Sequence, residues 1–266
     1  NIENKEKYFL IDGNLKNNRT RISAQLISLF TKSSIQNFSN IDISSENNFQ
    51  FKINKQFKIK DLEIKSNIIL NKANYKKDLP KLKEYLPKFN NLFELENHKI
   101  DLIIKKKKLS IKGKGNLSFE DTKETIEYKI EKLNDNFNFK SLITLNNNPV
   151  IINFLNYKKK INTKAILKFE GKLIKNKKIF IKNIEFIENK NKFIFDNLNF
   201  SEHFKINSVD KINLSFKNVQ KKKISINLIK DKKNYKIIGK NFDASKIIES
   251  FFNDKSEKEL SSIFNN

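Results

Sequence analysis

The sequence has no cysteine, methionine or tryptophan, and only five glycines and three prolines in 266 residues. The absence of cysteine excludes disulfides, thiolate catalysis and cysteine-ligated zinc, but it leaves the cellular compartment open. No apolar run is as long as a membrane span, and no signal peptide is visible. Because methionine is missing even at the first position, we expect the chain to be a segment of a longer protein.

The chain is strongly basic, but its charge is not arranged as in a typical nucleic-acid-binding domain. The formal net charge is +24, yet only Arg19 and Arg21 of the 54 basic residues are arginines. The lysines follow the polar positions of nearly every expected strand, whereas base recognition favours arginine and phosphate binding favours a localised patch. We interpret the lysines as a solvated face and expect no nucleic-acid partner. Weak attraction to anionic lipid headgroups stays open.

Apolar and polar residues alternate with a period of two through most of the chain. The clearest stretch is 211–240, in which three such segments follow one another. This period gives each strand one apolar and one polar face, and short polar connections predict antiparallel neighbours. The pattern predicts roughly fifteen to twenty short strands, among them a single strand over 150–157. The fold class is therefore mainly β.

Two or three short helices are expected. The best internal one lies near 78–90, with Asp78 as its N-cap, Pro80 in its first turn and Pro87 at its end. We expect residues 1–242 to form the sheet and residues 243–266 to form a closing helix and tail.

Most of the glycines lie inside expected strands in similar settings. Gly13, Gly115 and Gly171 are each followed by a polar residue and a leucine, and Gly239 is a variant of this pattern. A glycine within a strand permits a bulge or a bend, so that a long sheet can coil strongly. None of them fits a dinucleotide-binding fingerprint or a phosphate-binding loop.

The many apolar strand faces need a partner, because few helices are expected to cover them. The sheet can fold on itself as a sandwich or closed barrel, or it can pack on another copy or a further domain. It can also stay open as a gutter or half-barrel whose apolar wall holds lipid. From the pattern alone, the self-covered sandwich is favoured, since a large empty apolar groove promotes aggregation.

Candidate catalytic and metal sites are weak. His98 and His203 stand among polar residues without a second ligand at a suitable spacing. Turn or edge positions explain the carboxylate pairs Asp61/Glu63 and Glu120/Asp121 better than acid–base chemistry does. We therefore expect neither an enzyme nor a cofactor.

Two stretches resemble the AsmA-like family, in particular its YhdP-type branch. They are Leu167-Lys-Phe-Glu-Gly-Lys-Leu173 and the closing Tyr235-Lys-Ile-Ile-Gly-Lys-Asn-Phe-Asp-Ala-Ser-Lys-Ile-Ile248, and the Gly-polar-Leu strands add to the likeness. The resemblance is best over residues 100–250. It implies a long β-sheet gutter in the periplasm, anchored to the inner membrane by a helix outside this segment.

The same resemblance implies a function without a catalytic step. The segment would bind phospholipid acyl chains and help to move phospholipid between the inner and outer membranes. The alternative is a structural or adhesive β-sandwich domain of a surface or periplasmic protein, without a ligand. The expected lipid-groove residues are Ile111, Leu117, Phe119, Leu167, Phe169, Ile212, Leu214, Phe216, Ile224, Ile226 and Leu228.

Overall fold

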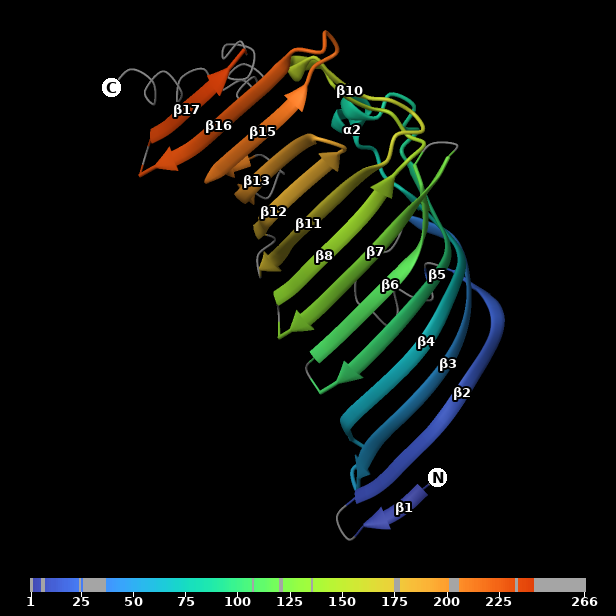
Figure 1. The fold of residues 1–266 in the computed structure, drawn as a ribbon. Coiled ribbons are helices and arrows are strands. Elements are labelled where there is room, and N and C mark those ends of the chain that lie inside the picture. Colours follow the sequence, from blue (N-terminus) through green and yellow to red (C-terminus); the bar gives the residue numbers. More distant parts are fainter. Residues whose placement is uncertain are drawn as a thin grey trace.

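The computed structural model describes residues 2–5, 8–23, 25, 37–106, 108–119, 122–134, 136–174, 178–200, 206–232 and 234–241. Most of these residues are in strands of one large antiparallel sheet (Figure 1). The prediction of a mainly β chain with few helices is thereby confirmed. His203, Glu120, Asp121 and the expected closing helix over 243–266 lie outside the described residues.

The strands follow in chain order, and almost every one pairs with the next (Figure 1). The 15-stranded sheet is open, with β1 and β17 as the edges of its described part. Its strands are β1 (Ile2–Lys5), β2 (Tyr8–Ile22), β3 (Phe38–Asn54), β4 (Ile59–Lys76), β5 (Leu92–Lys105), β6 (Lys108–Ser118), β7 (Lys123–Leu133), β8 (Asn136–Leu145), β11 (Ala165–Ile174), β12 (Lys178–Glu188), β13 (Asn191–Phe200), β14 (Ile206–Ser208), β15 (Lys211–Lys217), β16 (Lys223–Asp231) and β17 (Asn234–Lys240).

The N-terminal strands are longer than their sequence pattern predicts. β3 has 17 residues and β4 has 18, although the alternation predicts strands at 49–53, 57–59 and 62–70 and a short strand at 41–43. Irregular pairing is what breaks the alternation, because the β3–β4 register shifts between Ser39 and Ile43 and again between Gln50 and Lys52. A bulge displaces side chains from strict alternation while the strand continues. The long strands curve along their length in Figure 1.

The internal helix is shorter than predicted. α2 runs only over Pro80–Tyr85, and its N-cap is Leu79. The prediction that Asp78 caps it was wrong: no side chain caps this helix, and the Asp78 carboxylate instead accepts a hydrogen bond from Asn91 at 3.0 Å. Pro80 does stand in the first turn, where its missing N–H costs nothing. Among the described residues, no helix is long and apolar enough to span a membrane.

A small hairpin interrupts the sheet between β8 and β11. Its parts are β9 (Val150–Ile152), the 3-10 turn η1 (Asn153–Leu155) and β10 (Tyr157–Lys159). The prediction of one strand over 150–157 was wrong, because Asn156 takes the left-handed conformation with φ 50° and reverses the chain. The hairpin is tied to the main sheet by the Val219 N–H, which donates to the Asn156 carbonyl at 2.9 Å.

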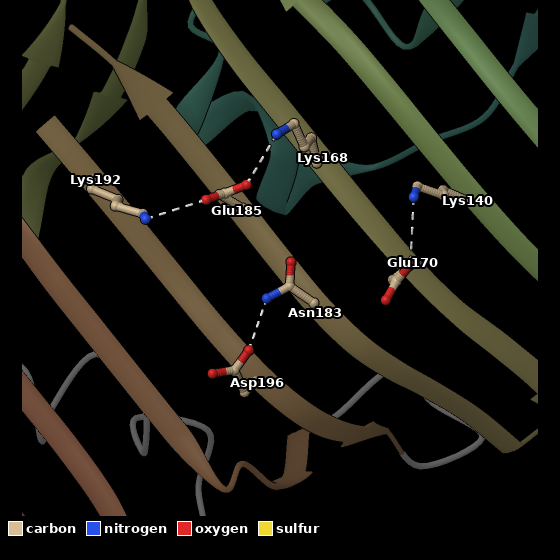
Figure 2. Close-up of polar contacts among 7 residues, drawn as sticks. All are labelled: Lys140, Lys168, Glu170, Asn183, Glu185, Lys192 and Asp196. Atoms are coloured by element: carbon tan, nitrogen blue, oxygen red, sulfur yellow. Dashed lines mark hydrogen bonds and ion pairs between the residues drawn. The ribbon is translucent and has the colours of Figure 1, made fainter. Parts of the chain in front are cut away.

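The polar face of the sheet carries ion pairs between neighbouring strands (Figure 2). The Glu185 carboxylate on β12 lies 3.3 Å from Lys168 Nζ on β11 and 3.5 Å from Lys192 Nζ on β13. Asn183 donates to Asp196 at 2.8 Å in the next row. These side chains are partly solvated, so each pair contributes little to stability and mainly keeps lysines of neighbouring strands from repelling one another.

Candidate functional site: the apolar face of the sheet

The strand register places the expected groove residues on one face. Residues directly opposite each other in neighbouring antiparallel strands point to the same side. One continuous row across the sheet consists of Ile226, Leu214, Phe193, Phe186, Leu167, Ile143, Ile126 and Gly115. A parallel row consists of Leu228, Ile212, Phe195, Ile184 and Phe169. Ile111 and Leu117 share this face, because they lie at even spacings from Gly115 on β6.

The hairpin covers this face over the C-terminal strands. The Tyr157 ring lies over the sheet, with its centroid 4.7 Å from that of Phe193 and 5.7 Å from that of Phe216. Phe186 joins the same aromatic cluster, and Leu155 of η1 is buried in the core with it. The protein's own side chains therefore fill this part of the face.

The expected groove residues divide into two sets. Eight are 2–9% exposed and belong to the hydrophobic core: Leu117, Phe119, Ile212, Leu214, Phe216, Ile224, Ile226 and Leu228. The other three are half-buried: Ile111, Leu167 and Phe169. Leu167 is partly buried and packs against the hydrophobic core. Ile111 lies further toward the N-terminal strands, outside that cluster.

A half-buried apolar surface continues over the N-terminal strands. One row across β5 to β8 consists of Leu102, Ile111, Ile130 and Phe139. The next row consists of Phe49, Ile64, Ile104 and Leu109. None of these side chains belongs to the buried core of the described residues. We call these eight residues the N-terminal apolar surface.

A buried carboxylate fixes the start of the hairpin. Glu124 on β7 is 2% exposed, and its carboxylate accepts hydrogen bonds from the N–H groups of Asn146, Asn147 and Asn148 at 2.7–2.8 Å. The Asn148 side-chain amide donates a fourth bond at 3.0 Å. Consecutive N–H groups that converge on one carboxylate form an anion-binding nest. The turn between β8 and β9 is thus wrapped around Glu124.

Lys159, on the second strand of the hairpin, holds the same β8–β9 turn through its carbonyl groups. Its ammonium group is fully buried and donates to the carbonyls of Asn146, Asn148 and Lys160 at 2.8–3.1 Å. Burial lowers the pKa of Lys159, while the charges of Glu124 and Glu188 oppose that shift. All three ammonium donors have acceptors, so this arrangement serves to hold the hairpin in place.

A second polar contact lies beneath the hairpin. The Tyr157 hydroxyl donates to Glu188 Oε2 at 2.6 Å, and the Asn191 side-chain amide donates to the same oxygen at 2.6 Å. Burial is the main cause that raises the pKa of Tyr157. The phenol therefore stays protonated and acts as a hydrogen-bond donor.

His98 is a structural residue at the boundary between the two parts of the face. It is fully buried, with Nε2 2.8 Å from the Asn116 carbonyl and Nδ1 3.2 Å from the Tyr128 hydroxyl. Burial lowers the pKa of His98 and raises that of Tyr128 to about 12. A neutral imidazole that donates from Nε2 and accepts at Nδ1 satisfies both contacts. Within the described ranges, no three His, Cys, Asp or Glu side chains gather closely enough to hold a metal ion.

The strand glycines make room for aromatic rings. A Cβ at Gly113 would lie 2.2 Å from the Tyr128 ring, and one at Gly115 would lie 2.3 Å from the His98 ring. Gly13 stands in the same relation to Phe49. At Gly171 the expected bulge is present between Glu170 and Gly171, and a Cβ there would lie 2.3 Å from the Phe180 carbonyl oxygen. Close packing across strands thus accompanies these glycines, and the register also shifts on β5 opposite Gly115, between Glu96 and Lys99.

Sequence reasoning missed the polar residues that hold the hairpin. Glu124, Asn148, Lys159 and Glu188 stand in ordinary strand or turn contexts, and most of their contacts span 11 to 31 positions of the chain. The available signal was the placement of Glu124 and Lys159 on the apolar phase of their strands. No protein-family model, curated protein or solved structure matches this chain.

Proposed function

We propose that this chain is a segment of a bacterial envelope protein that binds phospholipid acyl chains on the apolar face of its sheet. In this proposal the sheet is an open gutter in the periplasm, as in the AsmA-like proteins that the sequence resembles. A helix outside this segment anchors the protein to the inner membrane. The segment helps to move phospholipid between the inner and outer membranes, and no bond is made or broken.

The observation that carries the proposal is the uneven coverage of the apolar face. Tyr157 and Leu155 pack on the C-terminal strands, where Leu214 and Ile226 are each 2% exposed. The N-terminal apolar surface consists of half-buried side chains in two adjacent rows. Acyl chains packed there would remove this surface from water, at about 25 cal/mol for each Å². The lipid site therefore centres on Ile111 and its neighbours, away from Leu214.

Native mass spectrometry of the chain purified from a membrane-containing lysate tests the proposal. We expect bound phospholipid at a defined stoichiometry, identified after extraction. Ile111→Lys places a charge on the N-terminal apolar surface and should remove the lipid. Ile103→Lys is the matched control, because Ile103 lies on the neighbouring strand, points to the polar face and is 44% exposed. Lipid-free wild-type protein, or equal lipid loss in both variants, would refute the proposal.

A ligand-free structural or adhesive domain is the second candidate. It is favoured by the aromatic cluster of Tyr157, Phe186, Phe193 and Phe216, which shows that the chain fills part of its own apolar face. This candidate predicts a heat-stable monomer without co-purifying lipid. Leu214→Lys does not separate the two candidates, because a lysine at this core position should unfold the C-terminal strands in either case.

A further inference from the structure

The turn between β3 and β4 lies at one corner of the sheet, near β1 (Figure 1). Apolar side chains at this corner are exposed. Phe57 is 87% exposed and Ile59 is 60% exposed. Phe9 on β2 and Ile59 on β4 both lie opposite Ile53, one on each side of β3, so their side chains form one apolar row that ends at the turn. We call Phe9, Phe57 and Ile59 the apolar corner.

Phe57 takes a backbone conformation that folding alone does not favour for this residue type. Its φ is 57°, in the left-handed region where bulky side chains are strained and asparagine is well tolerated. Fifteen described non-glycine residues have positive φ, nine of them are asparagines, and Phe57 is the one with an apolar side chain. A strained residue whose side chain contacts little of its own protein points to a role outside the fold.

The turn that carries Phe57 is held in place by its own hydrogen bonds. The Asn54 side-chain oxygen accepts from the N–H groups of Gln56 at 3.1 Å and Lys58 at 2.8 Å. The Phe57 N–H donates to the Asn54 carbonyl at 2.9 Å. Phe57 is therefore presented outward by an ordered turn.

Lysines surround the apolar corner. Lys55, Lys58 and Lys60 are all exposed, and Lys106 follows on the adjacent β5–β6 turn. The nearby carboxylate Asp61 is already paired with Lys52 at 2.7 Å. The corner thus combines exposed aromatic and aliphatic side chains with unneutralised positive charge. This combination binds anionic bilayer surfaces, because the apolar groups enter the interface while the lysines meet the headgroups.

We propose that the apolar corner docks the protein onto an anionic phospholipid membrane, with Phe57 inserted among the headgroups. The apolar corner lies on the same face as the N-terminal apolar surface, four residues further along β3 from Phe49, but it shares no residue with the surface where single acyl chains are proposed to bind. The two can therefore fail independently. Vesicle docking should survive Ile111→Lys, and lipid carried in the purified protein should survive substitutions at Phe57.

Co-sedimentation tests docking with vesicles of equal parts phosphatidylcholine and phosphatidylglycerol, compared with vesicles of phosphatidylcholine alone. We expect the full chain to bind the mixed vesicles and to bind the neutral vesicles weakly. Phe57→Asn should weaken binding roughly tenfold or more, the loss expected for one large apolar side chain. Lys55→Gln and Lys58→Gln should each weaken binding about fivefold, and added salt should also weaken binding.

Two controls separate docking from folding. Val219→Asn changes an apolar residue that is 60% exposed in the β15–β16 turn, at the opposite rim and next to lysines, and should leave binding unchanged. Phe57→Asn should keep or raise the melting temperature, because asparagine relieves the left-handed strain. Undiminished vesicle binding by Phe57→Asn would overturn the proposal. So would equal binding to neutral vesicles, equal loss in Val219→Asn, or a lowered melting temperature of Phe57→Asn.

Discussion

Glu124→Gln should destabilise the protein far more than an ordinary surface substitution, because it removes the charge around which the β8–β9 turn is built. The carboxylate accepts four hydrogen bonds, three of them from consecutive backbone N–H groups at 2.7–2.8 Å. A glutamine keeps the size of the side chain, but it loses the charge, and its NH2 group replaces one of the two acceptor oxygens and so faces an N–H donor. A hydrogen bond to a charged group contributes about 1.5–3 kcal/mol, and breaking a buried charged contact typically costs about 3–5 kcal/mol. We expect a loss of about 3–5 kcal/mol in the free energy of unfolding.

Glu127→Gln is the matched control on the same strand. The Glu127 side chain is 52% exposed and pairs with Lys114 at 2.7 Å on the polar face, so its removal should cost about 0–1 kcal/mol. Urea unfolding followed by circular dichroism measures both values. Hydrogen exchange of the Asn146 to Asn148 amides in Glu124→Gln should be faster than in the wild-type protein. Equal losses for the two variants, or unchanged protection of these amides, would refute the nest as the element that holds the hairpin.

Three further predictions concern His98 at the boundary of the two parts of the apolar face, Gly171 on β11 and Tyr157 of the hairpin. Burial lowers the pKa of His98, so below about pH 6.5 the unfolded chain binds a proton that the folded chain does not. The free energy of unfolding should therefore decrease as the pH falls below about 6.5. Urea midpoints at neutral and mildly acidic pH measure this decrease, and His98→Gln should make it smaller. Gly171→Val should cost about 1–3 kcal/mol, because its side chain meets the Phe180 carbonyl, and a native-like melting temperature would contradict this. Tyr157→Phe should cost about 1–3 kcal/mol by leaving Glu188 with one fewer donor, which thermal unfolding can check.

The sequence was sufficient to predict the repeated strands, because alternation reports which side of a strand is buried. It placed Ile212, Leu214 and Phe216 on one face, and the register joins them to Leu167 across the sheet. Alternation does not report what covers that face. The hairpin that covers Phe193 and Phe216 depends on a left-handed Asn156 and on a turn built around Glu124, whose contacts join distant positions of the chain.

The glycines illustrate the same limit of a local pattern. Gly113 and Gly115 stand on one strand phase, and sequence reasoning linked Gly115 to a bulge or bend of the sheet. The structure shows that Tyr128 and His98 occupy the space above them. The partner of each glycine lies on a neighbouring strand, so only the register identifies it. A glycine opposite an aromatic residue in an adjacent strand is therefore a signal for the pairing, once a register is assumed.

The apolar face has a covered part and an uncovered part because the hairpin is inserted at one place in the sheet, between β8 and β11. The chain between β8 and β11 leaves the sheet and returns over it as the hairpin, whereas β5 to β8 follow one another through short turns. The hairpin extends over the strands that follow β11 and reaches Phe186, Phe193 and Phe216, whereas Ile111 lies outside the resulting core. We propose that an acyl chain binds to the part of the apolar face that the hairpin does not reach.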